Sequence, residues 1–299
     1  MREVRAIRSL PFRHAAKPQL GVEVFRLSDL YARADRRVLD HALDTPQRPE
    51  FHTIYVGLRG RGTMVVDFTS VPLAAEHVTV VARGRVQQFV VERGVDAWMV
   101  LFAPELAGHG ADDPLRAPAI LSPAWAVPAI RVPARERLEL LAIVDQLVTE
   151  QARPFDAFQP AIQIALLRAV LLRLERLHGG AVAPLPDPLQ RFLTILERDH
   201  ARTRAVSHYA RAAGVSARRL GELLGDHAGK STKQVIDERV VLEHKRLLVH
   251  TELSVKELAA RTGFDEPTNM VKFFRHHTGQ TPMAFRASHR TFLPSGRRS

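Results

Sequence analysis

Cysteine is absent from the sequence. Its absence excludes disulfide-stapled folds, thiolate metal sites, iron–sulfur clusters and cysteine nucleophiles, and it fits the reducing cytoplasm in which we expect the protein. No stretch approaches the roughly 18 consecutive apolar residues of a membrane-spanning helix. The first residues, MREVRAIRSLPFRHAAKP, carry basic side chains but no apolar core, so we expect no secretory signal.

Acidic residues are in short supply relative to basic ones. The chain has 43 Lys and Arg against 32 Asp and Glu, a net charge of +11. Residues 186–299 hold 20 basic and 12 acidic residues, so most of the excess lies towards the C-terminus. This imbalance indicates an anionic partner and favours nucleic acid. A basic face that is simply solvated is the alternative that composition leaves open.

Short runs rich in valine, threonine and aromatic residues fill the segment from Gly21 to Phe102. Glycine or proline interrupts them at RGRG (59–62), SVPLAAE (70–76) and RGV (93–95). Strands of this length and spacing are typical of an antiparallel barrel or sandwich. The predicted strands are FHTIYVGL, GTMVVDF, HVTVVAR, VQQFVVE and DAWMVLF.

The hydrophobic period changes near residue 133. Residues 134–151 and 157–178 place apolar side chains at intervals of three and four, which predicts two helices. Residues 179–188, rich in glycine and proline, predict a linker. The second helix carries a wide apolar stripe, which either packs on its own domain or forms a dimer seam. The stripe consists of Ile164, Leu166, Leu167, Val170, Leu171, Leu174 and Leu177.

An internal repeat near the C-terminus is the strongest pattern in the sequence. HYARAAGVSARRLGELLGDHAG (208–229) and ELAARTGFDEPTNMVKFFRHHTG (257–279) share a small residue, a turn glycine and a closing glycine in the same order. The paired positions are Ala210 and Ala259, Gly214 and Gly263, Leu220 and Met270, Leu224 and Phe274, and Gly229 and Gly279.

Each residue type in the repeat has a structural role. The alanine lets two helices cross closely, and the turn glycine adopts the left-handed conformation that ends the first helix. Ser216 or Asp265 is expected to cap the second helix, and Ser254 with Glu257 has the spacing of a capping box. The pattern therefore predicts two helix-turn-helix modules on a basic segment, which favours binding to nucleic acid.

Residues 189–287 resemble the DNA-binding domain of the AraC/XylS family of bacterial transcription regulators. The resemblance rests on HYARAAGVSARRL, on DERVVLEHKRLLVHTELSVKELAARTGFDE and on NMVKFFRHHTGQTPMAFR. The chain departs from the family at Leu224 and Met270, where phenylalanine is usual, and at His244, where alanine is usual. We expect Leu224 and Met270 to be tolerated core exchanges, and His244 either to pack half-exposed or to crowd the connecting helix, about 231–250.

The resemblance implies a two-domain α+β architecture. It assigns residues 1–132 to a cupin-like antiparallel β-barrel that binds an effector, 133–178 to helices for dimerisation or coupling, 179–188 to a linker, and 189–299 to an all-α domain with two helix-turn-helix modules. The implied partners are double-stranded promoter DNA, a small-molecule effector, a second copy of the chain and RNA polymerase. The sequence leaves open whether transcription is activated or repressed, and which effector or operator is used.

The family places one recognition helix of each module in a major groove. The resemblance thereby assigns DNA contact to two sets of residues. Arg218 is the preferred guanine reader, Asn269 the adenine reader and Val271 a contact to a thymine methyl, whereas Thr268 and Lys272 are expected at phosphates. A phosphate contact or a solvated charge is the alternative for Arg218, and local capping is the alternative for Asn269. The sets are Ser216, Ala217, Arg218, Arg219 and Glu222, and Pro267, Thr268, Asn269, Val271, Lys272 and Arg275.

Three further arginines of the basic segment have two interpretations. Arg239, Arg275 and Arg286 could each contact phosphate or form an internal ion pair.

Many cupin barrels are metal enzymes, which makes this the alternative function. The predicted barrel offers only His52 and His77, without the paired histidines and glutamate that such a site needs, so we expect no metal and no cofactor. Alternation in the strand 52–58 instead places His52, Ile54 and Val56 on one face, where they would line an effector pocket. A satisfied structural histidine is the other interpretation of His52. An effector-independent DNA-binding protein is the third function class.

Overall fold

The computed structural model describes residues 8–12, 17, 20–29, 46–90, 94–107, 119–121, 129–179 and 185–289. The chain divides into two units, one of residues 8–184 and one that takes in the residues from 185 onwards. Residues 133–178, expected as a coupling segment, fall within the first unit. Across the described ranges, no helix is both long and apolar enough to cross a membrane.

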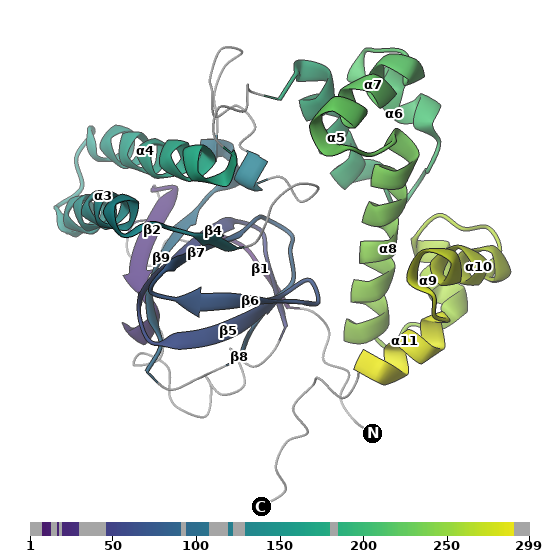
Figure 1. The fold of residues 1–299 in the computed structure, drawn as a ribbon, viewed down its shortest axis with the longest axis horizontal. Helices are drawn as coiled ribbons and strands as arrows, with labels where there is room; N and C mark the ends of the chain where they lie inside the picture. Colours follow the sequence, from purple (N-terminus) through teal and green to yellow (C-terminus); the bar gives the residue numbers. More distant parts are fainter. Residues whose placement is uncertain are drawn as a thin grey trace, which may run out of the picture. The chain divides into compact units, whose positions relative to one another are not determined.

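Two five-stranded sheets make up the first unit (Figure 1). One sheet has the order β10-β7-β4-β9-β2, and all its neighbours are antiparallel. The other has the order β1-β3-β8-β5-β6, and β1 and β3 run parallel. The elements are β1 (Arg8–Leu10), β2 (Val22–Arg26), β3 (Gln47–Pro49), β4 (His52–Arg59), β5 (Arg61–Val66), β6 (Thr69–Ala74), β7 (His77–Val81), β8 (Gln87–Val90), β9 (Asp96–Phe102) and β10 (Ala129–Arg131), with short 3-10 turns at Pro104–Ala107 and Ala119–Leu121.

The central strand β4 is buried on both faces. Ile54 and Val56 face helices α3 (Ala134–Ala152) and α4 (Gln159–Gly179), which cover the first sheet (Figure 1). Tyr55, between them, faces the second sheet and packs with residues of β5, β6 and β8. The first unit therefore has three layers, in the order helices, sheet, sheet.

The expectation of a closed antiparallel barrel is wrong. The described strands form two separate sheets, one of which contains a parallel pair. The predicted break at 70–76 is also wrong, because β6 occupies most of it. Pro72 is tolerated there because β6 is an edge strand, where a missing N–H removes no bond from the interior of the sheet. All five predicted strands are present, as β4, β5, β7, β8 and β9.

The apolar stripe of α4 packs on its own domain. Leu167, Val170, Leu171 and Leu174 are fully buried in the core between the helices and the first sheet. The dimer-seam interpretation of this stripe is therefore wrong. Both predicted helices are present within two residues of their expected ends.

A glutamine side chain completes the free edge of the first sheet. Val24 lies on the edge strand β2, and its backbone N–H donates to Gln151 Oε1 at 2.7 Å. Gln151 Nε2 returns a hydrogen bond to the Val24 carbonyl at 2.8 Å. The amide of α3 thus satisfies a peptide group that would otherwise be open to pairing with another strand.

The second unit consists of helices, and the predicted repeat is visible in their arrangement. Helices α6 and α7 form one pair, and α9 and α10 form the other. The long helix α8 runs from the first group of helices to the second (Figure 1). The helices are α5 (Asp187–Asp199), α6 (Val206–Ala213), α7 (Ala217–Ala228), α8 (Thr232–His250), α9 (Val255–Arg261), α10 (Pro267–Thr278) and α11 (Pro282–His289).

The positions at which the chain departs from the family are core positions. Leu224 and Met270 are both fully buried, as expected of core exchanges. His244 is also completely buried, so the expectation of a half-exposed side chain is wrong. The paired residues Ala210 and Ala259 are both buried, as expected of small residues on the inner face of the first helix of each module.

Candidate DNA-binding interface

The first module turns sharply at a glycine. Gly214 has a φ of +77°, and its N–H bonds to the Arg211 carbonyl, which closes α6. Ser216 then caps α7, because its Oγ accepts a hydrogen bond from the Arg219 N–H at 3.1 Å. The predicted capping role of Ser216 is confirmed, and the cap fixes where α7 begins.

The outer face of α7 is polar and exposed to solvent. Leu220, Leu223 and Leu224 are buried on the inner face. Ala217, Arg218, Arg219 and Glu222 are exposed on the outer face, beside Ser216. One side of this short helix is thus anchored by leucines while the other presents charge to solvent.

Glu222 binds both neighbouring arginines. Arg218 Nε donates to Glu222 Oε1 at 3.0 Å, and Arg219 Nη1 donates to Oε2 at 3.3 Å. The two guanidiniums, Arg218 foremost, hold the pKa of Glu222 below its ordinary value. A DNA phosphate or guanine must compete with this carboxylate for both arginines. The spacing of three and four residues on a helix is the sequence signal for these pairs.

The second module begins with a capping box. Ser254 Oγ accepts from the Glu257 N–H, and Glu257 Oε2 accepts from the Ser254 N–H at 2.7 Å, as predicted. The cap predicted at Asp265 is wrong, because α10 starts at Pro267 and its N-cap is Glu266, whose side chain makes no capping bond. Proline at the first helical position supplies the start instead, since its ring fixes a helical φ.

The outer face of α10 occupies the same place in the second module as that of α7 in the first, but it carries different side chains. Thr268, Asn269, Lys272 and Arg275 are exposed, and Pro267 and Val271 are half-buried, while Met270 and Phe274 anchor the helix. Among the described residues, the side chain of Asn269 has no hydrogen-bond partner. Its amide is therefore not used as a local cap. This face presents an amide, a hydroxyl and two unpaired cations.

Comparison with known proteins bears on this unit. A family described as "Helix-turn-helix domain" matches residues 209–288. The HTH-type transcriptional regulator GlxA of Rhizobium meliloti is 35% identical over 98 residues, which cover 33% of this chain and 29% of that protein. The HTH-type transcriptional regulator ExsA of Pseudomonas aeruginosa is 27% identical over 126 residues, 42% of this chain and 41% of that protein.

The second unit of this chain is therefore a helix-turn-helix domain similar to those of AraC/XylS transcriptional regulators. Both of these relatives are transcriptional regulators. The DNA-binding domain of AdpA, solved with a target DNA, is 32% identical and covers 37% of this chain and 100% of that one, with a TM-score of 0.34. The chain spans less than half the length of GlxA or ExsA, so the likeness concerns the DNA-binding part.

The geometry of this AraC/XylS domain separates the three ambiguous arginines. Arg239 is nearly buried and forms internal ion pairs, with Nε 2.9 Å from Glu197 Oε1 and Nη1 3.2 Å from Glu243 Oε2. Arg286 is buried and donates to the carbonyl of Leu248 in α8 and to that of Leu253 in the segment between α8 and α9. Only Arg275 of the three is exposed, so a phosphate contact stays a prediction for this residue.

The predicted effector residues do share one face of β4, but that face does not line the space between the sheets. Ile54 and Val56 are packed against α3 and α4. His52 stacks on Phe102 with ring centroids 5.1 Å apart, and its Nδ1 accepts the Arg83 N–H at 3.1 Å. Burial, with the nearby charge of Arg83, lowers the pKa of His52 to about 4. This histidine is neutral and satisfied at physiological pH.

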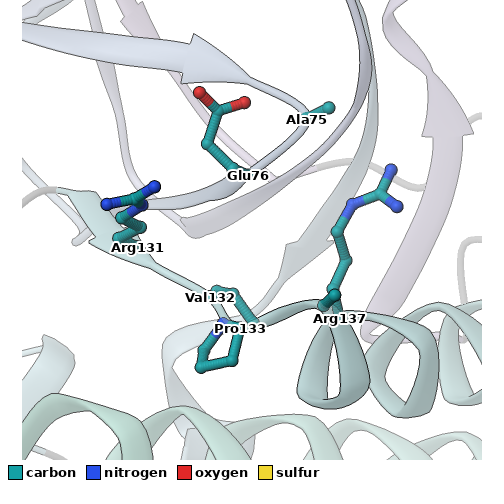
Figure 2. Close-up of a pocket in the computed structure, with 7 residues that line it drawn as sticks. Ala75, Glu76, Arg131, Val132, Pro133 and Arg137 are labelled. Carbon is teal, nitrogen blue, oxygen red and sulfur yellow. The ribbon is translucent and has the colours of Figure 1, made fainter.

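An open pocket of about 580 Å³ lies elsewhere in the first unit (Figure 2). It forms where the β6–β7 turn, β10 and the start of α3 meet. Arg137 Nη2 is held by the carbonyls of Gly57 and Leu58 at 3.2 and 3.1 Å. Among the described residues, no three His, Asp or Glu side chains are grouped where they could hold a metal. The pocket is lined by Ala75, Glu76, Arg131, Val132, Pro133, Ala134 and Arg137.

Proposed function

We propose that this protein is a cytoplasmic transcription regulator that binds promoter DNA sequence-specifically through α7 and α10, as a homodimer controlled by a small molecule. The observation that carries the proposal is the repeated module. Each copy anchors its second helix by apolar residues and leaves an exposed polar face that starts at the helix N-terminus. Helices presented in this way fit the major groove of B-DNA.

The residue roles follow from the chemistry of each face. Arg218 would bind guanine through two parallel N–H bonds once it leaves Glu222, and Asn269 would bind adenine through its free amide. Thr268, Lys272 and Arg275 would hold phosphates, which fixes register without reading sequence. Ser216 and Pro267 would bring the starts of α7 and α10 close to the sugar–phosphate backbone of the DNA. Ala217 and Val271 would make apolar contacts with the bases.

Selection of binding sites from random DNA tests this proposal. The full-length protein is expected to enrich two sequence blocks about one helical turn apart. Arg218→Ala should relax one block and Asn269→Ala the other, each with a loss of roughly tenfold or more for its preferred base. Lys256→Ala is the matched control, because Lys256 is an exposed cation on α9 and not on a reader helix. Enrichment of no motif above a salt-sensitive background would contradict the proposal.

The homodimer is proposed through the outer face of α4. The inner apolar stripe of α4 packs within its own domain. A second apolar stripe lies on the outer face, and its residues follow one another at intervals of four and three, as in a coiled coil. Phe158 is 75% exposed, Ile162 42% and Leu172 41%. A long, exposed apolar stripe of this kind is typical of an interface. The stripe consists of Phe158, Ile162, Ala165, Ala169 and Leu172.

Effector control is proposed through the pocket in Figure 2. Arg131 and Arg137 outnumber the carboxylate of Glu76 there, which favours a small anionic molecule such as a carboxylate. Pro133 and Ala134 line the same pocket at the start of α3, so an occupant would touch the helix pair that carries the proposed interface. A melting temperature raised by small carboxylates in the parent protein and unchanged in Arg131→Ala would support this. Equal shifts in both would contradict it.

A further inference from the structure

The two modules are in direct contact away from α8. Arg204, in the loop between α5 and α6, belongs to the first module. Its Nη1 donates to the carbonyls of Thr262 and Gly263, at 3.3 and 3.2 Å, in the turn of the second module. The guanidinium also lies over the ring of Phe264, 3.6 Å from its centroid. One arginine thus binds the second module both by hydrogen bonds and by its flat face.

The backbones of the two modules also touch. Gly263 has a φ of +72°, and a Cβ at this position would lie 2.8 Å from the Ala201 carbonyl oxygen and 3.1 Å from that of Arg202. Only glycine allows so close an approach between the two main chains. The contact therefore leaves little room for the modules to slide past one another.

A third contact holds the same turn from α8. His244 Nε2 lies 2.7 Å from Thr262 Oγ1, and that hydroxyl donates to the Leu258 carbonyl at 2.8 Å. The hydroxyl has one proton, so it accepts from His244, and the histidine carries its proton on Nε2. The His244 ring also packs against Phe264, with centroids 5.4 Å apart. The turn is thereby fixed both to the connecting helix and to the first module.

We propose that Arg204, Gly263 and His244 form a latch that sets the separation and angle of the two reader helices, and thereby the one spacing of DNA blocks that the protein accepts. The latch rests on the proposed function. A single helix of about 28 Å, the length of α8, can bend and fray at its ends. The latch adds a second connection between the modules and closes a ring that resists such bending. Arg204 is a positioning residue in this account, because it lies in a loop and not on a reader helix.

Loss of the latch should change the preferred separation of the two DNA blocks more than the base sequence of each block. With Arg204→Ala, the two blocks selected from random DNA should keep their sequences, while their separation should spread over neighbouring values. Affinity for the parent spacing should fall by about tenfold, because the second module must then be ordered at each binding event. A role limited to stability would lower affinity for every spacing equally.

A distance measurement tests the latch without DNA. Because the chain has no cysteine, Asp226→Cys on α7 and His276→Cys on α10 place two spin labels at exposed positions of the full-length protein. Pulsed electron resonance should give a narrow distance distribution with Arg204 present and a broad one with Arg204→Ala. Arg204→Lys should also broaden it, since lysine keeps the charge but loses the planar face and the paired donors.

Two glycines provide a matched pair of variants. Gly263→Ala and Gly214→Ala strain equivalent left-handed turns, with φ values of +72° and +77°. Only at Gly263 does the added Cβ meet the backbone of the other module, whereas at Gly214 the nearest atom is Arg191 Nη2 at 3.5 Å. Gly263→Ala should therefore broaden both the distance distribution and the spacing preference, while Gly214→Ala should leave both as in the parent.

The outcomes separate the latch from the proposed function. Broadened distances and relaxed spacing in Arg204→Ala and Gly263→Ala, in folded proteins, would support the latch. An unchanged distance distribution together with one unchanged spacing would overturn it. If the parent protein enriches no motif at all, the proposed function fails, and the distance distributions then decide for or against the latch on their own.

Discussion

At the residue scale, the ability of the interface to bind DNA phosphates depends on its carboxylates as much as on its arginines. Glu222 already binds Arg218 and Arg219 in the free protein, whereas Lys272 and Arg275 have no such partner among the described residues. The first reader helix must therefore give up internal pairs to bind DNA, and the second need not. Non-specific attraction to phosphate should accordingly come mainly from α10.

Removal of the Glu222 charge should raise non-specific affinity. Glu222→Gln frees two guanidiniums for phosphate, so we expect binding to random DNA at low salt to tighten by roughly threefold and its salt dependence to steepen. Asp226→Asn is the control, because it removes the same charge from an exposed position of α7 where the structure shows no ion pair. Equal effects of the two substitutions would show that only net charge matters.

His244 should make the second module sensitive to acid. Burial, followed by the charge of Arg204, lowers the pKa of His244 to about 3. The unfolded chain takes up a proton near pH 6.5 and the folded one does not. The stability from this residue is therefore complete above pH 6.5 and is lost as the pH falls towards 3, by up to about 1.4 kcal/mol per pH unit.

Hydrogen exchange of α9 and α10 between pH 7.5 and pH 5, corrected for intrinsic rates, measures this loss. His244→Ala, which installs the residue usual in the family, should flatten the pH dependence. His276→Ala, at an exposed histidine of α10, should leave it unchanged. A parent-like pH dependence in His244→Ala would contradict the assignment.

At the element scale, α4 has two apolar faces with different uses. The inner face is part of the core, and the outer face carries Ile162 and Leu172 into solvent, with the exposed Phe158 directly before the first turn. Apolar residues on more than one side of a helix indicate that the helix packs both on its own domain and on a partner. The sequence pattern offered the inner stripe as the seam with the partner, whereas that stripe packs within the domain. Only the packing against the first sheet distinguishes the two.

A charge on the outer face of α4 should abolish self-association. Leu172→Glu is expected to convert a dimer to a monomer in sedimentation velocity while the melting temperature changes little, because Leu172 is 41% exposed. Leu171→Glu, one residue away and fully buried, should instead unfold the first unit. A parent protein that sediments as a monomer at all concentrations would contradict the proposed interface.

Sequence patterns predicted the helices and strands better than the packing of these elements against one another. The alternation of β4 correctly put His52, Ile54 and Val56 on one face, but it could not tell which face met the helices, since both faces are buried. Pro72 masked β6, because proline marks both turns and edge strands. The helix-turn-helix repeat was predictable apart from the cap at Asp265, since its glycines and its other caps act locally. The Arg204 contact was not, because 58 residues separate its partners.

At the scale of the whole molecule, the chain joins a sheet unit to a DNA-binding unit of a known family. The first unit supplies the proposed dimer interface and the proposed effector pocket. The second supplies the two proposed reader helices, which are joined by α8 and by the proposed latch. Any effector that changes DNA affinity must in turn be bound more tightly or more weakly when DNA is present, since coupling is reciprocal. The central claim is that α7 and α10 occupy two successive major grooves of one site.

Methylation protection on the selected DNA site tests this claim most directly. Guanine N7 lies in the major groove, so an occupied groove shields it from reagent. We predict two protected blocks about one helical turn apart on one face of the DNA, with protection of one block lost in Arg218→Ala and of the other retained. Protection of a single block, or none at a site that the protein binds tightly, would contradict the claim.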